Sequence, residues 1–265
     1  MKVYDCFTFF NELDLLEIRL NELDDVVDYF VLVESKRSFQ NKPKECHYLN
    51  NKDRFEKFNH KIIRLEVPEN LFNENTRQNE INCWNYIITG LIAAKNNDII
   101  MIGALDEIPK SEIINNIKID HKFTICVTMN LYYYYMNTCF LHDFNKTEWH
   151  GTYITTFESL GKNNIYYSCI GDGLCSRIYC QNHIYGGWHY SSLGDEKNQK
   201  LKTINFGHDT CNHLTEEFFK ERIEKLEDPF GRTNEQKLHS IETLDHLPIY
   251  VQENIEKFKK LIYTL

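Results

Sequence analysis

Short apolar runs that alternate with helical segments constrain the fold of this 265-residue chain more than any other feature. Three such runs are Tyr29–Val33, Lys61–Leu65 and Ile99–Ile102. Runs this short and this apolar are typical of buried parallel strands, and amphipathic stretches between them are typical of crossover helices. The pattern therefore predicts an α/β fold of the Rossmann-like kind with a mixed central sheet.

The rest of the chain adds further predicted elements. Residues 3–10 and 123–135 are rich in aromatic and β-branched side chains, which favours strands, and Ile165–Cys169 and Leu174–Cys180 are interpreted as shorter strands. Helical spacing predicts the following helices: 13–23 with Asn11 as N-cap, one starting near Asn79, 111–117, 215–226 and 250–265.

Composition excludes several classes of protein. With 42% hydrophobic and 14% aromatic residues, the chain is expected to form one domain over residues 1–265. The net charge of -9, without a basic block, argues against a nucleic-acid partner. No stretch approaches the roughly 18 apolar residues of a membrane span, and the first residues already have the pattern of a strand.

Cysteine usage bears on the compartment. Nine cysteines are scattered without a Cys-x-x-Cys pair, which favours reduced and mostly buried thiols. We therefore expect a cytoplasmic protein. The many Asn, Ile and Lys residues indicate an AT-rich coding genome, such as that of a microbe or a virus.

The segment after Ile102 is placed where an open parallel sheet binds its ligands, beyond the carboxyl ends of its strands. It contains Asp106 and Glu107. From spacing alone, two such acids also suit the first turn of a helix that begins near Pro109, where the helix dipole stabilises negative charge. Spacing alone favours the helix interpretation.

Five sequence blocks resemble glycosyltransferase family 17, in the expected order and over nearly the whole chain. They are residues 5–20 (DCFTFFNELDLLEIRL), 33–35 (VES), 105–109 (LDEIP), 186–191 (GGWHYS) and 247–250 (LPIY). The resemblance implies a single GT-A domain, with residues 1–120 as the nucleotide-binding half and residues 121–265 as the acceptor-binding half with the C-terminal helices. It also implies transfer of a sugar from a nucleotide diphosphate, by default UDP-N-acetylglucosamine, to a glycan hydroxyl with inversion.

A departing diphosphate needs a cation, and the resemblance implies Mn²⁺ or Mg²⁺ held by an Asp-x-Asp element. Here that element is Ala104-Leu105-Asp106, so the first carboxylate is missing. Three explanations remain: an introduced Asp-to-Ala substitution, a natural variant that binds metal through Asp106 and a histidine, and a degenerate transferase that only binds. A missing ligand is expected to slow transfer by a factor on the order of 10².

Other site residues follow from the resemblance together with side-chain chemistry. Asp106 and His208 are the expected metal ligands, with His189 as the alternative. Ala104 and Leu105 are expected beside the donor, as part of the same element. The remaining expected donor contacts are Glu34 for the ribose or uracil, Arg77 and Lys202 for phosphate, and Trp188 and His189 for the sugar.

An inverting transfer also needs a base beside the acceptor hydroxyl. Asp172 is the first candidate, and Glu107 and Asp195 are the others. The roles of His142, Asp143, Trp149 and His150 stay open. A rival hypothesis is a non-catalytic protein that binds sugar nucleotides or glycans. A metallohydrolase is disfavoured because no His-x-x-x-His or Cys-x-x-Cys spacing occurs.

Overall fold

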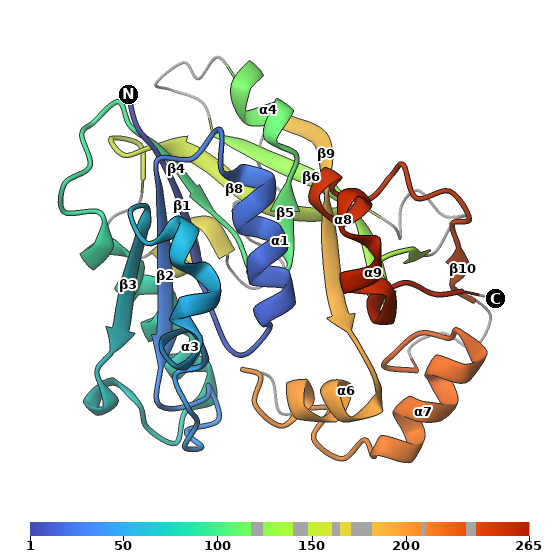
Figure 1. The fold of residues 1–265 in the computed structure, drawn as a ribbon. Coiled ribbons are helices and arrows are strands. Elements are labelled where there is room, and N and C mark those ends of the chain that lie inside the picture. Colours follow the sequence, from blue (N-terminus) through green and yellow to red (C-terminus); the bar gives the residue numbers. More distant parts are fainter. Residues whose placement is uncertain are drawn as a thin grey trace.

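The computed structural model describes residues 1–117, 124–139, 148–160, 165–170, 182–207, 210–231 and 237–264. Its described strands form one ten-stranded mixed sheet in the order β10-β7-β6-β8-β4-β1-β2-β3, with β9 paired to β5 and β6 (Figure 1). This confirms the predicted α/β class. The strands are β1 (Val3–Thr8), β2 (Tyr29–Ser35), β3 (Ile62–Val67), β4 (Ile99–Ile102), β5 (Glu107–Pro109), β6 (Ile125–Tyr134), β7 (Thr138–Cys139), β8 (Glu148–Thr156), β9 (Asn182–Leu193) and β10 (His239–Ser240).

Helices cover both faces of the sheet. The helices are α1 (Leu13–Leu23), α2 (His47–Asn50), α3 (Thr76–Tyr86), α4 (Ser111–Asn116), α6 (Glu196–Thr203), α7 (Glu216–Lys225), α8 (Ile249–Glu253) and α9 (Ile255–Phe258). Shorter 3-10 segments are Lys52–Phe58, Glu69–Leu71, Ile87–Gly90 and Lys259–Leu261.

The first half of the chain is a parallel βαβ arrangement. Strand β1 pairs in parallel with β2 and β4, and β2 pairs in parallel with β3. Alternate residues of β1 face opposite sides, so Phe7 packs in the core around α1 while Cys6 packs in the core around α3. The carboxyl ends of β1, β2 and β4 therefore meet at one edge of the sheet.

The sheet continues through the second half, where β4 pairs antiparallel with β8 and β8 pairs antiparallel with β6. Strand β9 then runs parallel to β6 and antiparallel to β5. We did not predict this long strand, which contains the Gly186-Gly187 pair although glycine is depleted in strands. Both glycines have φ near +150°, and a Cβ on Gly187 would lie 2.6 Å from the Ile108 carbonyl oxygen. The glycines let β9 approach β5 closely.

Three predicted elements need correction. Residues 166–170 form a π-helical turn instead of a strand, because Tyr166 and Cys169 are buried in the core around α3. Helix α1 begins after Glu12, so Asn11 is not its N-cap. The predicted helix 250–265 is broken into α8, α9 and a 3-10 turn. The predicted strand Leu174–Cys180 lies outside the described residues.

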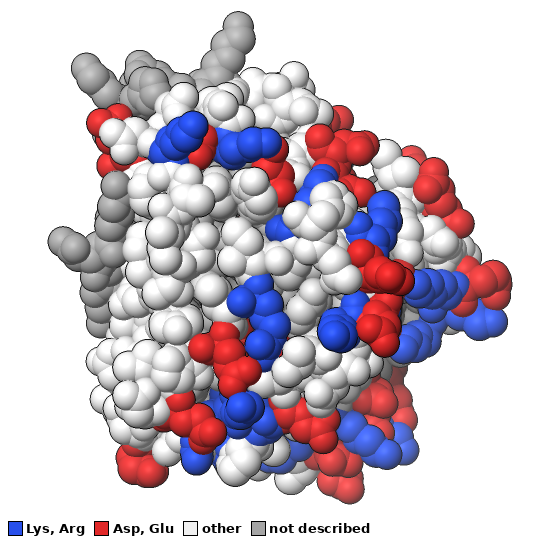
Figure 2. Space-filling model, turned by 60° about the vertical axis from the view of Figure 1, so that its left-hand side comes forward, with Lys and Arg blue, Asp and Glu red and all other residues white. Residues whose placement is uncertain are grey.

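The described surface and core agree with several features of the sequence. Figure 2 shows one face of the molecule, on which basic and acidic side chains are interspersed. No disulfide joins any two of the seven described cysteines, and six of these are buried. None of the described helices is long and apolar enough to cross a membrane.

Glu17 joins the first and last sequence blocks. Its carboxylate accepts hydrogen bonds from the Tyr250 hydroxyl at 2.5 Å and from Arg54 Nε at 2.7 Å, and it also pairs with Lys257. Glu17 is buried on α1, whereas Tyr250 belongs to α8. The contact therefore fixes the C-terminal helices against α1.

We expect Tyr250→Phe to lower the free energy of unfolding by about 1–2 kcal/mol, because it removes a hydrogen bond to a charged group. Urea denaturation measures this loss. Tyr263→Phe is the control, since the hydroxyl of Tyr263 makes none of the described hydrogen bonds. Equal stability of the two variants would contradict a fixing role for Glu17.

Candidate functional site

The loop between β4 and β5, residues 103–106, leaves the sheet at the carboxyl end of β4 and turns sharply. The amide of Glu107 donates to the Ala104 carbonyl at 2.9 Å. Gly103 is needed because a Cβ there would lie 2.5 Å from Thr152 Oγ1. Asp106 and Glu107 thus lie in this turn and at the start of β5, not in a helix. The interpretation as helix N-terminal acids is wrong.

The buried side chain of Arg19 connects this loop to β1 through hydrogen bonds. Its guanidinium forms two hydrogen bonds with the carboxylate of Asp5, at 2.8 and 2.7 Å, and both side chains are fully buried. Arg19 Nη1 also donates to the carbonyl oxygens of two loop residues and of the first residue of β5. These are Ala104 at 2.7 Å, Leu105 at 3.1 Å and Glu107 at 2.8 Å.

Asp5 and Arg19 belong to the first sequence block, but the sequence alone did not assign either residue a function. A signal was present, because Arg19 lies three residues after Leu16 on the apolar face of α1, where a charge needs a partner. The partner was identifiable only once β1, α1 and the loop were placed together.

Asp106 is the charged centre of the site. Its carboxylate lies 3.1 Å from Lys202 Nζ on α6 and 3.6 Å from His189 Nε2 on β9. Burial alone would raise the pKa of Asp106, but the two neighbours lower it well below its usual range. Burial would lower the pKa of Lys202, but Asp106 outweighs this effect and the pKa is raised. Both groups are therefore ionised at neutral pH.

Helix α6 brings Lys202 to Asp106 because it is anchored to the first half of the chain. The Gln40 amide donates to the carbonyls of Thr203 and Phe206, at 3.2 Å each. Lys42 donates to the Ile204 carbonyl at 2.7 Å. The side chain of Lys202 retains 30% of its exposure, so part of the ammonium side chain reaches the surface.

Glu107 supports the loop through both carboxylate oxygens. Oε2 accepts from the Ala104 amide at 2.9 Å, and Oε1 accepts from the indole of Trp149 at 2.7 Å. The residue is 2% exposed. This arrangement gives Glu107 a positioning function in the described conformation and leaves it poorly placed to receive a proton from an acceptor.

Trp149 is the aromatic residue that the structure adds to the site. Its ring lies 4.5 Å from that of His189, centroid to centroid, and it is 38% exposed. Trp188, which we expected to stack on a sugar, is 4% exposed, and its indole donates to the His246 carbonyl at 2.6 Å. Trp188 therefore packs in the core, because strand alternation turns it away from the face of His189.

Two residues that we expected to contact the donor form ion pairs with neighbouring side chains. Glu34 is 1% exposed and receives a hydrogen bond of 3.4 Å from Arg64 Nε. Arg77 lies in the first turn of α3, which begins three residues earlier than predicted, and pairs with Glu80 at 2.7 Å. Their contact with a donor stays a prediction.

The remaining candidates are only partly described. Asp172 and His208 lie outside the described residues, as do His142 and Asp143. Asp195 is exposed and caps α6 by accepting from the Asn198 amide at 3.0 Å. His150 points to the opposite face of the sheet from Trp149.

The described residues do not fit a Mn²⁺ or Mg²⁺ ion well. These ions prefer several oxygen ligands. Here the loop offers the single carboxylate of Asp106, which Lys202 already neutralises, while residue 104 contributes only a methyl group. Nδ1 of His189 is buried and has no hydrogen-bond partner among the described residues.

Comparisons with known proteins place this geometry in context. The family model described as glycosyltransferase family 17 matches residues 1–174. No curated protein matches the chain. Among solved structures, a 4-diphosphocytidyl-2C-methyl-D-erythritol synthase is 10% identical with a TM-score of 0.42, covering 70% of this chain and 89% of its own. The 2-C-methyl-D-erythritol 4-phosphate cytidylyltransferase of Francisella tularensis is 11% identical with a TM-score of 0.38, covering 71% and 91%.

Replacing Arg19 with Met should cost about 3–5 kcal/mol of unfolding free energy, because it leaves the buried Asp5 carboxylate unpaired. Chemical denaturation measures the loss. The double variant Arg19→Met/Asp5→Asn should recover part of it, since the unpaired charge is gone. Arg54→Met is the matched control on a partly exposed ion pair and should cost less. A loss below about 1 kcal/mol for Arg19→Met would contradict the role of this pair.

Proposed function

Because the chain belongs to glycosyltransferase family 17, we propose that it transfers a sugar from a UDP-sugar to a glycan hydroxyl with inversion. UDP-N-acetylglucosamine is the default donor. The family match supports the proposed class of reaction. The ion pair between Asp106 and Lys202, at the carboxyl end of β4, supports the proposed location of the donor site. Loops at this edge of an α/β sheet are where nucleotides bind.

In the proposed reaction, the acceptor oxygen forms a bond to the anomeric carbon of the sugar while the bond from that carbon to the diphosphate oxygen breaks. The electron pair leaves with UDP. The acceptor proton goes to a base, for which Asp172 stays the first candidate. Lys202 would neutralise the charge that develops on the leaving diphosphate, because its ammonium group is ionised and its side chain is 30% exposed.

Two further groups support a sugar site beside Asp106. The exposed part of the Trp149 indole offers an apolar face of the kind that stacks on a sugar ring. The buried Nδ1 of His189 lacks a described partner, and such an atom costs free energy unless a ligand or water satisfies it. We therefore place the transferred sugar near Trp149 and His189.

The dependence on Mn²⁺ stays a prediction. The described donor set argues for weak metal binding in this chain, since Ala104 supplies no oxygen and Lys202 occupies Asp106. We infer that Lys202 provides most of the positive charge at the diphosphate. An aspartate at position 104 would add the second carboxylate that a divalent cation prefers.

The second candidate function is binding of a sugar nucleotide or a glycan without catalysis. The specific observation that favours it is Ala104 within an otherwise complete sequence block. This candidate predicts binding of the donor without turnover.

Removing the Lys202 ammonium should lower kcat/KM for UDP-sugar by a factor on the order of 10², because a charge at the developing diphosphate is lost. UDP release from a panel of UDP-sugars, with glycan acceptors, measures the effect in Lys202→Ala. Lys197→Ala is the matched control, since Lys197 is an exposed residue of the same helix. Equal rates in the two variants would place the diphosphate elsewhere.

The variant Ala104→Asp tests the missing carboxylate. We expect it to gain UDP release by a factor on the order of 10² with Mn²⁺ and to lose this gain in EDTA. Calorimetry of UDP binding to both proteins accompanies the assay. Equal activity in both proteins would mean that residue 104 does not limit the reaction. If neither protein releases UDP although both bind the donor, the result would favour the non-catalytic candidate function.

A further inference from the structure

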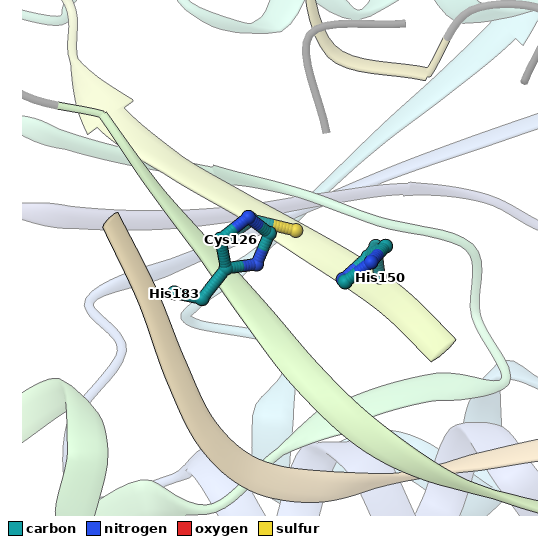
Figure 3. A group of neighbouring side chains, drawn as sticks. All are labelled: Cys126, His150 and His183. Atoms are coloured by element: carbon teal, nitrogen blue, oxygen red, sulfur yellow. The ribbon is translucent and has the colours of Figure 1, made fainter. Parts of the chain in front are cut away.

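Three side chains with soft or borderline ligand atoms meet on one face of the sheet, opposite Trp149. They are Cys126 of β6, His150 of β8 and His183 of β9, and their ligand atoms all lie within 4.8 Å of one another. Figure 3 shows the Cys126 sulfur pointing toward the His150 side chain. In the described part of the chain, no other group of three or more His, Cys, Asp or Glu residues satisfies this criterion.

The strand register explains why the three meet. Strand β6 lies between β8 and β9, and Cys126 is the direct partner of His183 across the β6–β9 pairing. His150 is the partner of Thr128, two residues from Cys126 and on the same face. The sheet hydrogen bonds therefore fix the three Cα positions before any ligand arrives.

The rings are also held close. The imidazoles of His150 and His183 are 4.7 Å apart, centroid to centroid. Thr128 Oγ1 lies 3.4 Å from Nδ1 of His183, so a hydroxyl can orient that ring. Groups that orient a histidine in this way are typical around bound metals.

We propose that Cys126, His150 and His183 bind one zinc-like divalent ion. A tetrahedral site with Zn–N bonds of about 2.1 Å and a Zn–S bond of about 2.3 Å places neighbouring ligand atoms roughly 3.3–3.6 Å apart. Since the described ligand atoms lie within 4.8 Å of one another, they need to approach by no more than roughly 1.5 Å to reach these separations. On binding, the thiol releases its proton and the thiolate sulfur forms the bond to the metal.

The ligand set distinguishes this ion from the one expected at a diphosphate. A thiolate and two imidazoles favour Zn²⁺ over Mn²⁺ or Mg²⁺, which prefer oxygen. Cys126 is buried, His150 is half-buried and His183 is exposed, so the ion enters from the side of His183. Three protein ligands leave the fourth position for water, and the ion would tie together the strands β8, β6 and β9.

The test uses the whole chain, freed of metal with EDTA and then titrated with Zn²⁺ or Co²⁺. We expect one ion per chain by elemental analysis after dialysis. The Co²⁺ form should have the intense d–d bands of a four-coordinate site and a thiolate-to-cobalt charge-transfer band. Zn²⁺ should raise the melting temperature, because it binds the folded state.

Cys126→Ser should abolish the charge-transfer band, whereas Cys83→Ser, a matched change at another buried cysteine, should keep it. His183→Ala should weaken Zn²⁺ binding at least about tenfold and, being at an exposed position, should leave the circular dichroism spectrum unchanged. Less than half an ion per chain, or full affinity in His183→Ala, would overturn the site. Neither result depends on whether the chain transfers a sugar.

Discussion

The buried ion pair between Arg19 and Asp5 is the interaction on which the candidate site depends. An unpaired charge at either position would be costly, so the two residues fix α1 against β1. The same guanidinium also donates hydrogen bonds to the carbonyl groups of Ala104, in the loop after β4, and of Glu107, at the start of β5. One side chain thus joins the first strand, the first helix and the loop that carries Asp106.

Hydrogen bonds join several of the sequence blocks that resemble the family. Glu17 of the first block accepts from Tyr250 of the last block, and Trp188 donates to the carbonyl of His246 just before it. His189 follows Trp188 and faces Asp106. Several residues of these blocks therefore position other parts of the chain, and the smaller set formed by Asp106, His189 and Lys202 is the site that we propose for the ligand.

Residue 104 is an alanine, so Asp106 is the single carboxylate of the loop formed by residues 103–106. The carboxylate of Asp106 pairs with Lys202 at 3.1 Å and lies 3.6 Å from His189 Nε2. A lysine ammonium neutralises phosphate charge as a point charge without fixed coordination geometry. The family membership and the unusual loop are thus compatible with a site that relies on a protein cation.

The sequence by itself determined the α/β class, the parallel strands of the first half and the placement of Asp106 beyond β4, because these follow from local periodicity and from the rule for strand ends. Only the tertiary structure decided that Trp188 is buried and Trp149 exposed, and that residues 166–170 are a turn rather than a strand. It also decided the partners of Arg19 and Lys202, and the meeting of Cys126, His150 and His183. Such contacts join residues far apart in the chain, and their register is set by strand pairing and packing, which no local pattern encodes.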